Sequence, residues 1–317
     1  MRRNPKPKRR YRLRNWCEYT TARRTRGSLT LWCDEAVVAG WVARERTGRR
    51  GRSRTYSDLA ITCMLTLQTV YHLSLSATVG LMRSLLTLVG GAAAALPIAH
   101  ESTLSRRRRT LDVALLAPAR ARPAEPLHLV VDSTGLKVYG EGEWKVRLHG
   151  KEKRRTWRKL HLMIDHTTHE AVTCSMSEQY VLDRKELPGL LKRVEGEVAE
   201  VLGDGAYDFQ DCYRAIAGMG ARAVIPPQVR ARVRSGEEFR DRNAAVLRGR
   251  EVGRDEWKKE AGYHRRSLAE TAMMRIKTIF SDKLKAREWS RQETELRVRC
   301  AALNRMTSLG MPQSDAV

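Results

Sequence analysis

The half of the chain from residue 127 onward alternates short apolar runs with helical patterns, and this order constrains the fold more than any other feature. The expected order is three strands (127–131, 157–165, 171–176), a helix (183–194), a strand (198–202), a helix (208–217), a strand (222–225), an insertion and a final helix (265–282). Strands interleaved with helices are typical of an α/β domain.

The preceding stretch, 57–116, carries apolar residues at helical spacing and predicts a helical domain. It includes a turn rich in Gly and Ala and then the segment HESTLSRRRRTL, which predicts a short helix carrying Arg106, Arg107, Arg108 and Arg109. A small-residue start leading into such a helix resembles the second helix of a helix-turn-helix, which would place these arginines on DNA. The alternative, a basic helix packed on the domain with solvated arginines, stays open.

Composition shifts divide the chain further. The expected parts are a basic N-terminal arm and first helix (1–56, with the helix at 31–43), a helical DNA-binding domain (57–116), a proline-rich linker (117–126), an α/β catalytic domain (127–300) with a basic, turn-rich insertion at about 228–262, and a C-terminal tail (301–317). The clustered cations of the arm favour phosphate binding over a solvated tail, because binding releases counterions from the nucleic acid.

Charge indicates the partner. Lys and Arg number 60 against 36 Asp and Glu, a formal net charge of +24, which favours nucleic acid as the partner over a membrane surface or a ribosome. No long apolar span suggests a membrane, and no apolar segment follows the basic N-terminus as a secretory signal requires. The six cysteines lack a CxxC pair, which argues against a zinc ribbon and a disulfide framework. A reducing cytoplasm is therefore the expected location.

Two aspartates follow apolar runs: Asp132 in VVDSTG and Asp204 in VLGDGAYD. A carboxylate at a strand end leaves the core but stays on rigid backbone, and glycine at 203 and 205 permits close approach of a ligand. Taken alone each aspartate is a weak signal, because Asp at such positions is often a turn former or a helix cap.

The last expected helix strengthens the case for a site. Tyr263, Arg266, Glu270 and Lys277 are separated by three, four and seven residues, so they share one face if the helix begins early enough. The alternative is a solvated face with charge pairs one turn apart. Three carboxylates brought together repel one another unless cations neutralise them, and hard oxygen ligands suit Mg²⁺ or Mn²⁺. Two such ions can clamp a phosphodiester for in-line displacement.

These residues match a known family. The spacing Y-x2-R-x3-E-x6-K from Tyr263 to Lys277 resembles the signature of bacterial DDE transposases of insertion-sequence family five. The motifs DSTG and DGAYD, and the segment HGKEKRRTWRKLHLMID between them, are also similar to that family. So are NWCEYTTARRTRGSLTLW and HESTLSRRRRTL in the N-terminal half, and the resemblance covers most of the chain.

The resemblance implies an RNase H-like catalytic domain, a mixed sheet flanked by helices, after the helix-turn-helix-like domain. It implies that Asp132, Asp204 and Glu270 hold two Mg²⁺ ions, with Mn²⁺ as substitute, for cutting transposon ends and joining the 3′-OH groups to target DNA. Arg266 and Lys277 would contact the DNA, with Tyr263 positioning that face. The partners would be terminal inverted repeats and target DNA, bound near the nucleoid by a homodimer or larger assembly.

Two other functions stay open: a catalytically silent helix-turn-helix regulator, and an RNase H-like nuclease that cuts without joining. Among further candidates, His161, Asp165, His166 and His169 look like a metal cluster. The segment DHTTH is interpreted instead as a turn between two strands. Asp208 is expected to cap the helix that follows it.

Overall fold

The computed structural model describes residues 11–44, 53–115, 125–138 and 156–316. Within them a six-stranded mixed sheet has the order β4-β3-β2-β5-β6, and β7 also pairs with β2. The strands are β2 (Leu127–Val138), β3 (Trp157–Asp165), β4 (Ala171–Glu178), β5 (Val198–Leu202), β6 (Arg222–Val224) and β7 (Lys283–Leu284). β3 runs antiparallel to both β2 and β4. β5 and β7 run parallel to β2, and β6 runs parallel to β5. The expected mixed α/β architecture is confirmed.

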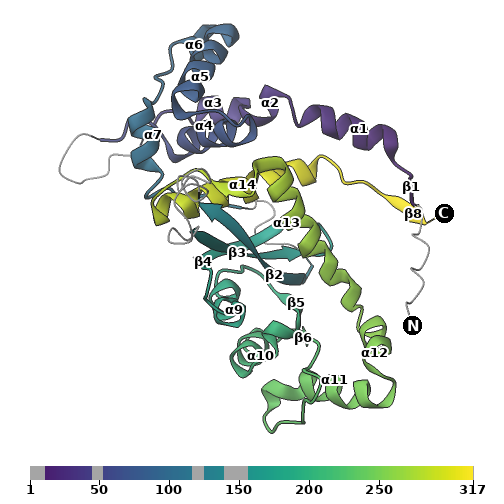
Figure 1. Ribbon diagram of the computed structural model, residues 1–317. Helices are drawn as coiled ribbons and strands as arrows, with labels where there is room; N and C mark the ends of the chain where they lie inside the picture. Colours follow the sequence, from purple (N-terminus) through teal and green to yellow (C-terminus); the bar gives the residue numbers. More distant parts are fainter. Residues whose placement is uncertain (1–10, 45–52, 116–124, 139–155, 317) are drawn as a thin grey trace, which may run out of the picture.

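Helices cover both faces of this sheet (Figure 1). They are α9 (Asp183–Leu191), α10 (Gln210–Ala217), α13 (Ser267–Phe280) and α14 (Trp289–Ser308). Because successive side chains of a strand point to opposite faces, β2 contributes to two cores. Leu129 and Val131 pack with α9 and α10, whereas Val130 and Leu136 pack with α13 and α14. The sheet flanked by helices agrees with the RNase H-like fold that the resemblance implies.

The N-terminal part is helical. Its helices are α1 (Trp16–Thr25), α2 (Leu29–Trp32), α3 (Glu35–Ala39), α4 (Asp58–Val70), α5 (Leu75–Val89), α6 (Gly91–Ala94) and α7 (Glu101–Arg107). The side chains of Asp34, Ser57 and Ser74 begin α3, α4 and α5 by accepting backbone N–H groups. The expected helix at 31–43 is wrong: it is interrupted where Asp34 caps α3. Buried residues of α4 and α5 join the same apolar cluster as α13 and α14.

The last long helix, α14, contacts both parts, since its Arg305 forms an ion pair with Asp34 at the start of α3 at 2.7 Å. The Asn304 side chain accepts the N–H of Ala171 at 2.7 Å and donates to its carbonyl at 2.8 Å. The two ends of the described chain also meet, because β1 (Tyr11–Leu13) pairs with β8 (Ser314–Ala316). The expected linker lies outside the described residues except for Glu125 and Pro126, and so do the first ten residues of the arm.

The insertion between β6 and α13 is mostly helical rather than turn-rich. It contains the 3-10 turn η4 (Glu237–Phe239) and the helices α11 (Arg240–Glu251) and α12 (Arg254–Glu260). Asp208, expected to cap α10, does not: it forms a buried ion pair with Arg242 of α11, with 2.7 Å between Oδ1 and Nε. The prediction failed because the partner of Asp208 lies 34 residues away in sequence.

Among the described residues, no single helix is both long and apolar enough to cross a membrane. The helices α4 and α5 are together long and apolar enough to do so, but the chain bends by 112° between them.

Candidate active site

Asp132 lies in the middle of β2 rather than at its end. The strand continues past it because β2 pairs with β3 from Leu129 to Lys137. The polar letters DSTG suggested a turn, but this stretch pairs with its neighbour and is half-buried. The parallel pairing with β5, in contrast, does stop just before Asp132, at the pair Val130 and Leu202. Asp132 is therefore at the carboxyl end of the parallel part of the sheet, where side chains of neighbouring strands meet.

Asp204 follows the end of β5 at the matching level. Since Val130 pairs with Leu202, two further residues along each chain lead to Asp132 and Asp204. Asp204 caps the 3-10 turn η3 (Gly205–Tyr207), its Oδ1 accepting the N–H of Ala206 at 2.9 Å. Gly203 is packed tightly, because a Cβ there would lie 3.0 Å from the ring of Tyr207. Both the capping and the site interpretations of Asp204 are therefore compatible with its geometry.

Glu270 comes from the first turn of α13, which begins at Ser267 rather than at 265 as expected. Tyr263 and Arg266 belong to the 3-10 turn η5 (Tyr263–Arg266), which runs directly into the helix. The buried face of α13 consists of the residues that the sequence indicated, Ala269, Ala272, Met273, Ile276 and Phe280. This packing on the sheet leaves Glu270 exposed, with 51% of its side chain accessible.

Arg266 joins two of the expected carboxylates. Its Nη1 donates to Oδ2 of Asp132 at 3.1 Å, and its Nη2 forms an ion pair with Oε1 of Glu270. The guanidinium also lies over the ring of Tyr263, 6.0 Å from the centroid. Lys277 is half-buried two helical turns beyond Glu270, about 10 Å farther along the axis. Of the signature residues, Arg266 thus directly contacts Asp132, and it connects this strand residue to Glu270 of α13.

The electrostatics of this edge are unbalanced. Burial raises the pKa of Asp132, and the carboxylates of Asp204 and Glu270 raise it further. The N–H of Ser133 and the guanidinium of Arg266 act in the opposite direction without cancelling the effect. Arg266 thus pairs with two of the three carboxylates, Asp132 and Glu270, and additional positive charge would stabilise the ionised form of all three.

The donor set fits hard cations, since it consists of carboxylate oxygens on two strands and a helix. The guanidinium of Arg266 lies between Asp132 and Glu270, so it supplies part of the positive charge that such a cation would supply. Among the described residues, the three carboxylates do not form a group with all ligand atoms within 4.8 Å of one another.

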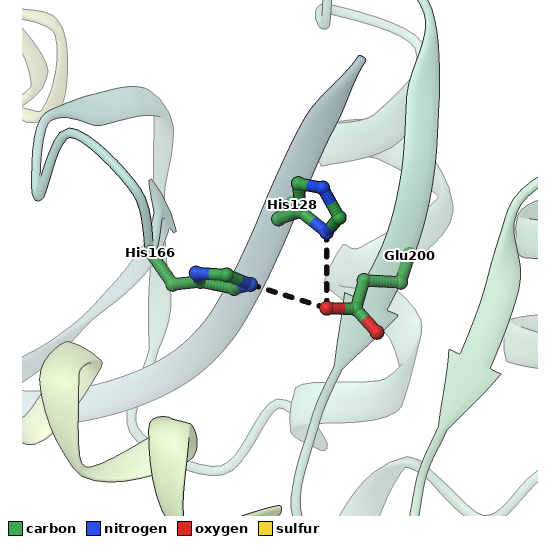
Figure 2. A group of neighbouring side chains, drawn as sticks. All are labelled: His128, His166 and Glu200. Atoms are coloured by element: carbon green, nitrogen blue, oxygen red, sulfur yellow. Dashed lines mark hydrogen bonds and ion pairs between the residues drawn. The ribbon is translucent and has the colours of Figure 1, made fainter. Parts of the chain in front are cut away.

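One group does meet that distance criterion: His128, His166 and Glu200 (Figure 2). His128 and Glu200 are not among the residues predicted from the sequence. A signal was present, because each is a polar residue inside an otherwise apolar strand. The segment DHTTH is a turn as expected, with Asp165 accepting the N–H groups of Thr167 and Thr168. His161 is buried in the sheet, its Nε2 lying 2.7 Å from the hydroxyl of Ser177.

The four arginines at 106–109 have different surroundings. Arg107 forms an ion pair with Asp58 of α4. Arg108 is 7% exposed and donates to Oε1 of Gln68 at 3.0 Å. Arg109 is exposed and forms a bidentate pair with Glu288 at 2.7 and 2.8 Å. Arg106 is exposed at the end of α7. Two of the four therefore have structural partners within the N-terminal helices.

Comparison with known proteins places this geometry in a family. Two family models, each described as a transposase DDE domain, match residues 123–305 and 24–141. Among solved structures, the chain is similar to a piggyBac transposase in a synaptic complex with hairpin DNA, at 11% identity. That similarity covers 89% of this chain and 75% of the other, with a TM-score of 0.37. Because the first family model covers more than half of the chain, the protein belongs to the family of transposase DDE domains.

Proposed function

We propose that the protein is a DNA transposase of the bacterial insertion-sequence family five type. It cleaves transposon ends to expose 3′-OH groups and joins these to target DNA. The observation that carries the proposal is the excess of carboxylates around Asp132 in a chain with a net charge of +24. In a protein that binds polyanions, neighbouring carboxylates without enough counter-charge are unfavourable, and bound cations would neutralise them.

Asp132, Asp204 and Glu270 are the proposed catalytic residues. Together they would hold two Mg²⁺ ions, or Mn²⁺ in their place, and the bound ions would supply the positive charge for activating water and stabilising the leaving 3′ oxygen. Backbone pairing positions Asp132, because β2 pairs with β3 at this level of the sheet, and Asp204 closely follows the last residue pair between β5 and β2. Glu270 is the adjustable member, since its exposed side chain can move toward the aspartates.

Arg266 has two proposed roles. In the free protein its guanidinium neutralises Asp132 and Glu270, which prevents the carboxylates from repelling one another. When DNA and cations are present, the same guanidinium is placed to bind a phosphate next to the scissile bond. Tyr263 supports it through the face of its ring. Lys277, which has no ion-pair partner among the described residues, would contact the phosphate backbone farther along α13.

The N-terminal helices are the proposed DNA-binding domain, in the manner of a helix-turn-helix. Arg106 and Arg109 are the exposed members of its basic segment and would contact phosphates, whereas Arg107 and Arg108 would hold α7 in place. Joining two transposon ends in one reaction requires two active sites, so a homodimer or larger assembly is the proposed active form. The proposed partners are the terminal inverted repeats and target DNA.

The test is cleavage and strand transfer on a labelled duplex carrying the element's own ends, with Mg²⁺ or Mn²⁺. Wild type would be compared with Glu270→Gln, which keeps the shape of the side chain and removes its charge. Glu251→Gln is the matched control, because Glu251 is an exposed carboxylate of α11 paired with an arginine. We expect cation-dependent cutting and joining in wild type and in the control, and neither in Glu270→Gln despite retained DNA binding.

Three other results would contradict the proposal in different ways. Activity that survives in Glu270→Gln would remove this residue from the site. Tight binding of the ends without cutting under either cation would favour a DNA-binding regulator. Cutting without any joined product would favour a nuclease of RNase H-like fold.

A further inference from the structure

Glu200 is the centre of a second charged cluster on the same face of the sheet. Its side chain is 7% exposed, and its Oε1 lies 3.0 Å from Nδ1 of His128 and 3.1 Å from Nε2 of His166 (Figure 2). Arg265 completes the cluster, with Nη1 at 2.6 Å from the same oxygen. The pKa of Glu200 is lowered, because the histidines and Arg265 outweigh the effect of burial.

The two histidines and the glutamate are of the type that binds zinc, but the guanidinium of Arg265 already contacts both His166 and Glu200. Nη1 of Arg265 lies 2.7 Å from Nε2 of His166 as well as 2.6 Å from Glu200. The other nitrogens of the guanidinium are also engaged, since Nε donates to the carbonyl of Gly262 at 3.0 Å. A planar guanidinium held at several points is a fixed group, and no metal is needed to balance the charge of Glu200.

The turn that presents Arg265 is built around its side chain. Gly262 has a φ of +65°, which favours glycine. A Cβ at this position would lie 2.8 Å from Nη2 of Arg265. Backbone conformation and space therefore both require glycine here, so that the guanidinium can fold back toward the sheet.

The cluster has a fixed relation to the candidate active site. His128 and Glu200 precede Asp132 and Asp204 by four residues each, on the same face of paired parallel strands, about 13 Å away along the sheet. Arg265 contacts Glu200, and the next residue, Arg266, contacts Asp132 in the candidate active site. Because η5 continues directly into α13, holding Arg265 also fixes the start of the helix that carries Glu270.

We propose that Arg265 is a positioning residue, held by His166 and Glu200, which sets the place of Arg266 and Glu270 over Asp132. This inference rests on the proposed function for its effect on catalysis. Arg265 touches none of the proposed reacting groups and acts through the register between η5 and β5. Because Arg265 contacts no proposed cation ligand, its loss should weaken cation affinity by less than the roughly 10- to 100-fold that follows loss of a group bonded directly to a ligand.

The test compares Arg265→Gln with Arg248→Gln as the matched control. Arg248 also forms a bidentate pair with a glutamate, Glu260 in the insertion, at 2.7 and 2.9 Å, but it does not contact the sheet strands β2 and β5. The first readout is amide hydrogen exchange over 263–270 in the metal-free protein. The second is the Mg²⁺ concentration that gives half-maximal cleavage of labelled transposon ends, with DNA affinity measured in parallel.

For Arg265→Gln we expect the rise in exchange rate to be largest at 263–270 and the half-saturating Mg²⁺ concentration to be raised by less than about tenfold, with DNA affinity unchanged. Arg248→Gln should match wild type in both. Adding Glu200→Gln to Arg265→Gln should change little more, because the same contact is already lost. Unchanged exchange and unchanged Mg²⁺ dependence in Arg265→Gln would overturn the proposal. So would exchange that rises equally over the whole chain, since that indicates general destabilisation.

Two further results separate the possible failures. If wild type does not cut the ends, the proposed function fails, while the exchange comparison still decides whether Arg265 fixes η5. A titration of wild type with Co²⁺ tests the zinc-type alternative. We expect no visible absorption of tetrahedral cobalt at equimolar metal. Strong absorption that disappears in His166→Ala would show a metal site in place of the arginine and would overturn the positioning role.

Discussion

Two charged clusters lie on the same face of one sheet and differ in how their charge is balanced. Around Glu200, one carboxylate has an arginine and two histidines within hydrogen-bond distance. Around Asp132, Arg266 pairs with Asp132 and Glu270 only, and burial together with the nearby carboxylates of Asp204 and Glu270 raises the pKa of Asp132. The charge of the first cluster is balanced within the chain, whereas we propose that bound cations complete the second. An unbalanced cluster on rigid strands is the arrangement expected of a functional site rather than of a structural one.

The contrast has a thermodynamic consequence. Groups arranged for catalysis often reduce the stability of the fold, whereas groups that serve only the fold increase it. If the two clusters differ as proposed, substitutions in them should have opposite effects on activity and stability.

The largest effect is expected for Asp132→Asn. Loss of a proposed cation ligand removes several kcal/mol of transition-state stabilisation, which corresponds to roughly a thousandfold or greater loss of end cleavage. Stability in metal-free buffer should stay within about 1 kcal/mol of wild type, because the substitution also removes repulsion from Asp204 and Glu270. Single-turnover cleavage and urea unfolding measure the two quantities. A variant that unfolds easily and cleaves normally would reverse the assignment of the clusters.

The second effect concerns Glu200→Gln, which breaks the balanced cluster. Removing one member of a buried ion pair leaves Arg265 without its counter-charge, and such changes cost about 3–5 kcal/mol when both partners are fully buried. Arg265 and His128 are partly exposed, so we expect about 2–3 kcal/mol in urea unfolding at neutral pH. A loss below about 0.5 kcal/mol, the usual range for surface substitutions, would show that this cluster stabilises little.

The difference in stability between wild type and Glu200→Gln should depend on pH in a defined direction. The pKa of Glu200 is lowered from its ordinary value of 4.5, so its ionised form is favoured in the folded state. Its contribution to stability is therefore fully present above pH 4.5 and is lost as the pH falls through the lowered folded-state pKa. The difference between wild type and Glu200→Gln should shrink below pH 4.5 in the same unfolding experiment. A difference that grows on acidification would contradict the assigned ionisation state.

Added cations should distinguish the clusters with a smaller effect. A ligand that binds only the folded state stabilises it by RT ln(1 + [L]/Kd), about 1.4 kcal/mol at ten times Kd. Mg²⁺ should therefore raise the unfolding free energy of wild type and not that of Asp132→Asn. Glu200→Gln should keep a response, displaced to higher Mg²⁺ concentration. Chelation with EDTA should reverse the effect, and an equal response of wild type and Asp132→Asn would place the bound ions elsewhere.

The two clusters also differ in how well the sequence predicted them. Asp132, Asp204 and Glu270 stand in local motifs, and the spacing from Tyr263 to Glu270 fits one helical face. The structure places Arg266 between Asp132 and Glu270, which spacing alone could not indicate.

The balanced cluster escaped prediction because its members come from separate segments. His128, His166, Glu200 and Arg265 are each isolated in sequence and meet only when β2, β5 and η5 pack together. The strand end assigned to Asp132 and the cap assigned to Asp208 failed for the same reason. In both cases the deciding partner, β3 or Arg242, is distant in sequence.

The smallest expected effect extends the comparison from carboxylates to arginines. Arg106 is exposed, whereas Arg108 is buried against Gln68. We therefore propose that Arg106 binds DNA and that Arg108 stabilises the fold. Arg106→Gln should weaken binding to all DNA sequences alike and lower the slope of log K against log salt by about 1, because one phosphate contact is lost. Arg108→Gln should lower stability and leave the slope unchanged once the protein is folded. Salt titrations of DNA binding measure the slopes. An unchanged slope in Arg106→Gln would remove this helix from the DNA interface and leave the basic N-terminal arm as the main source of phosphate contacts.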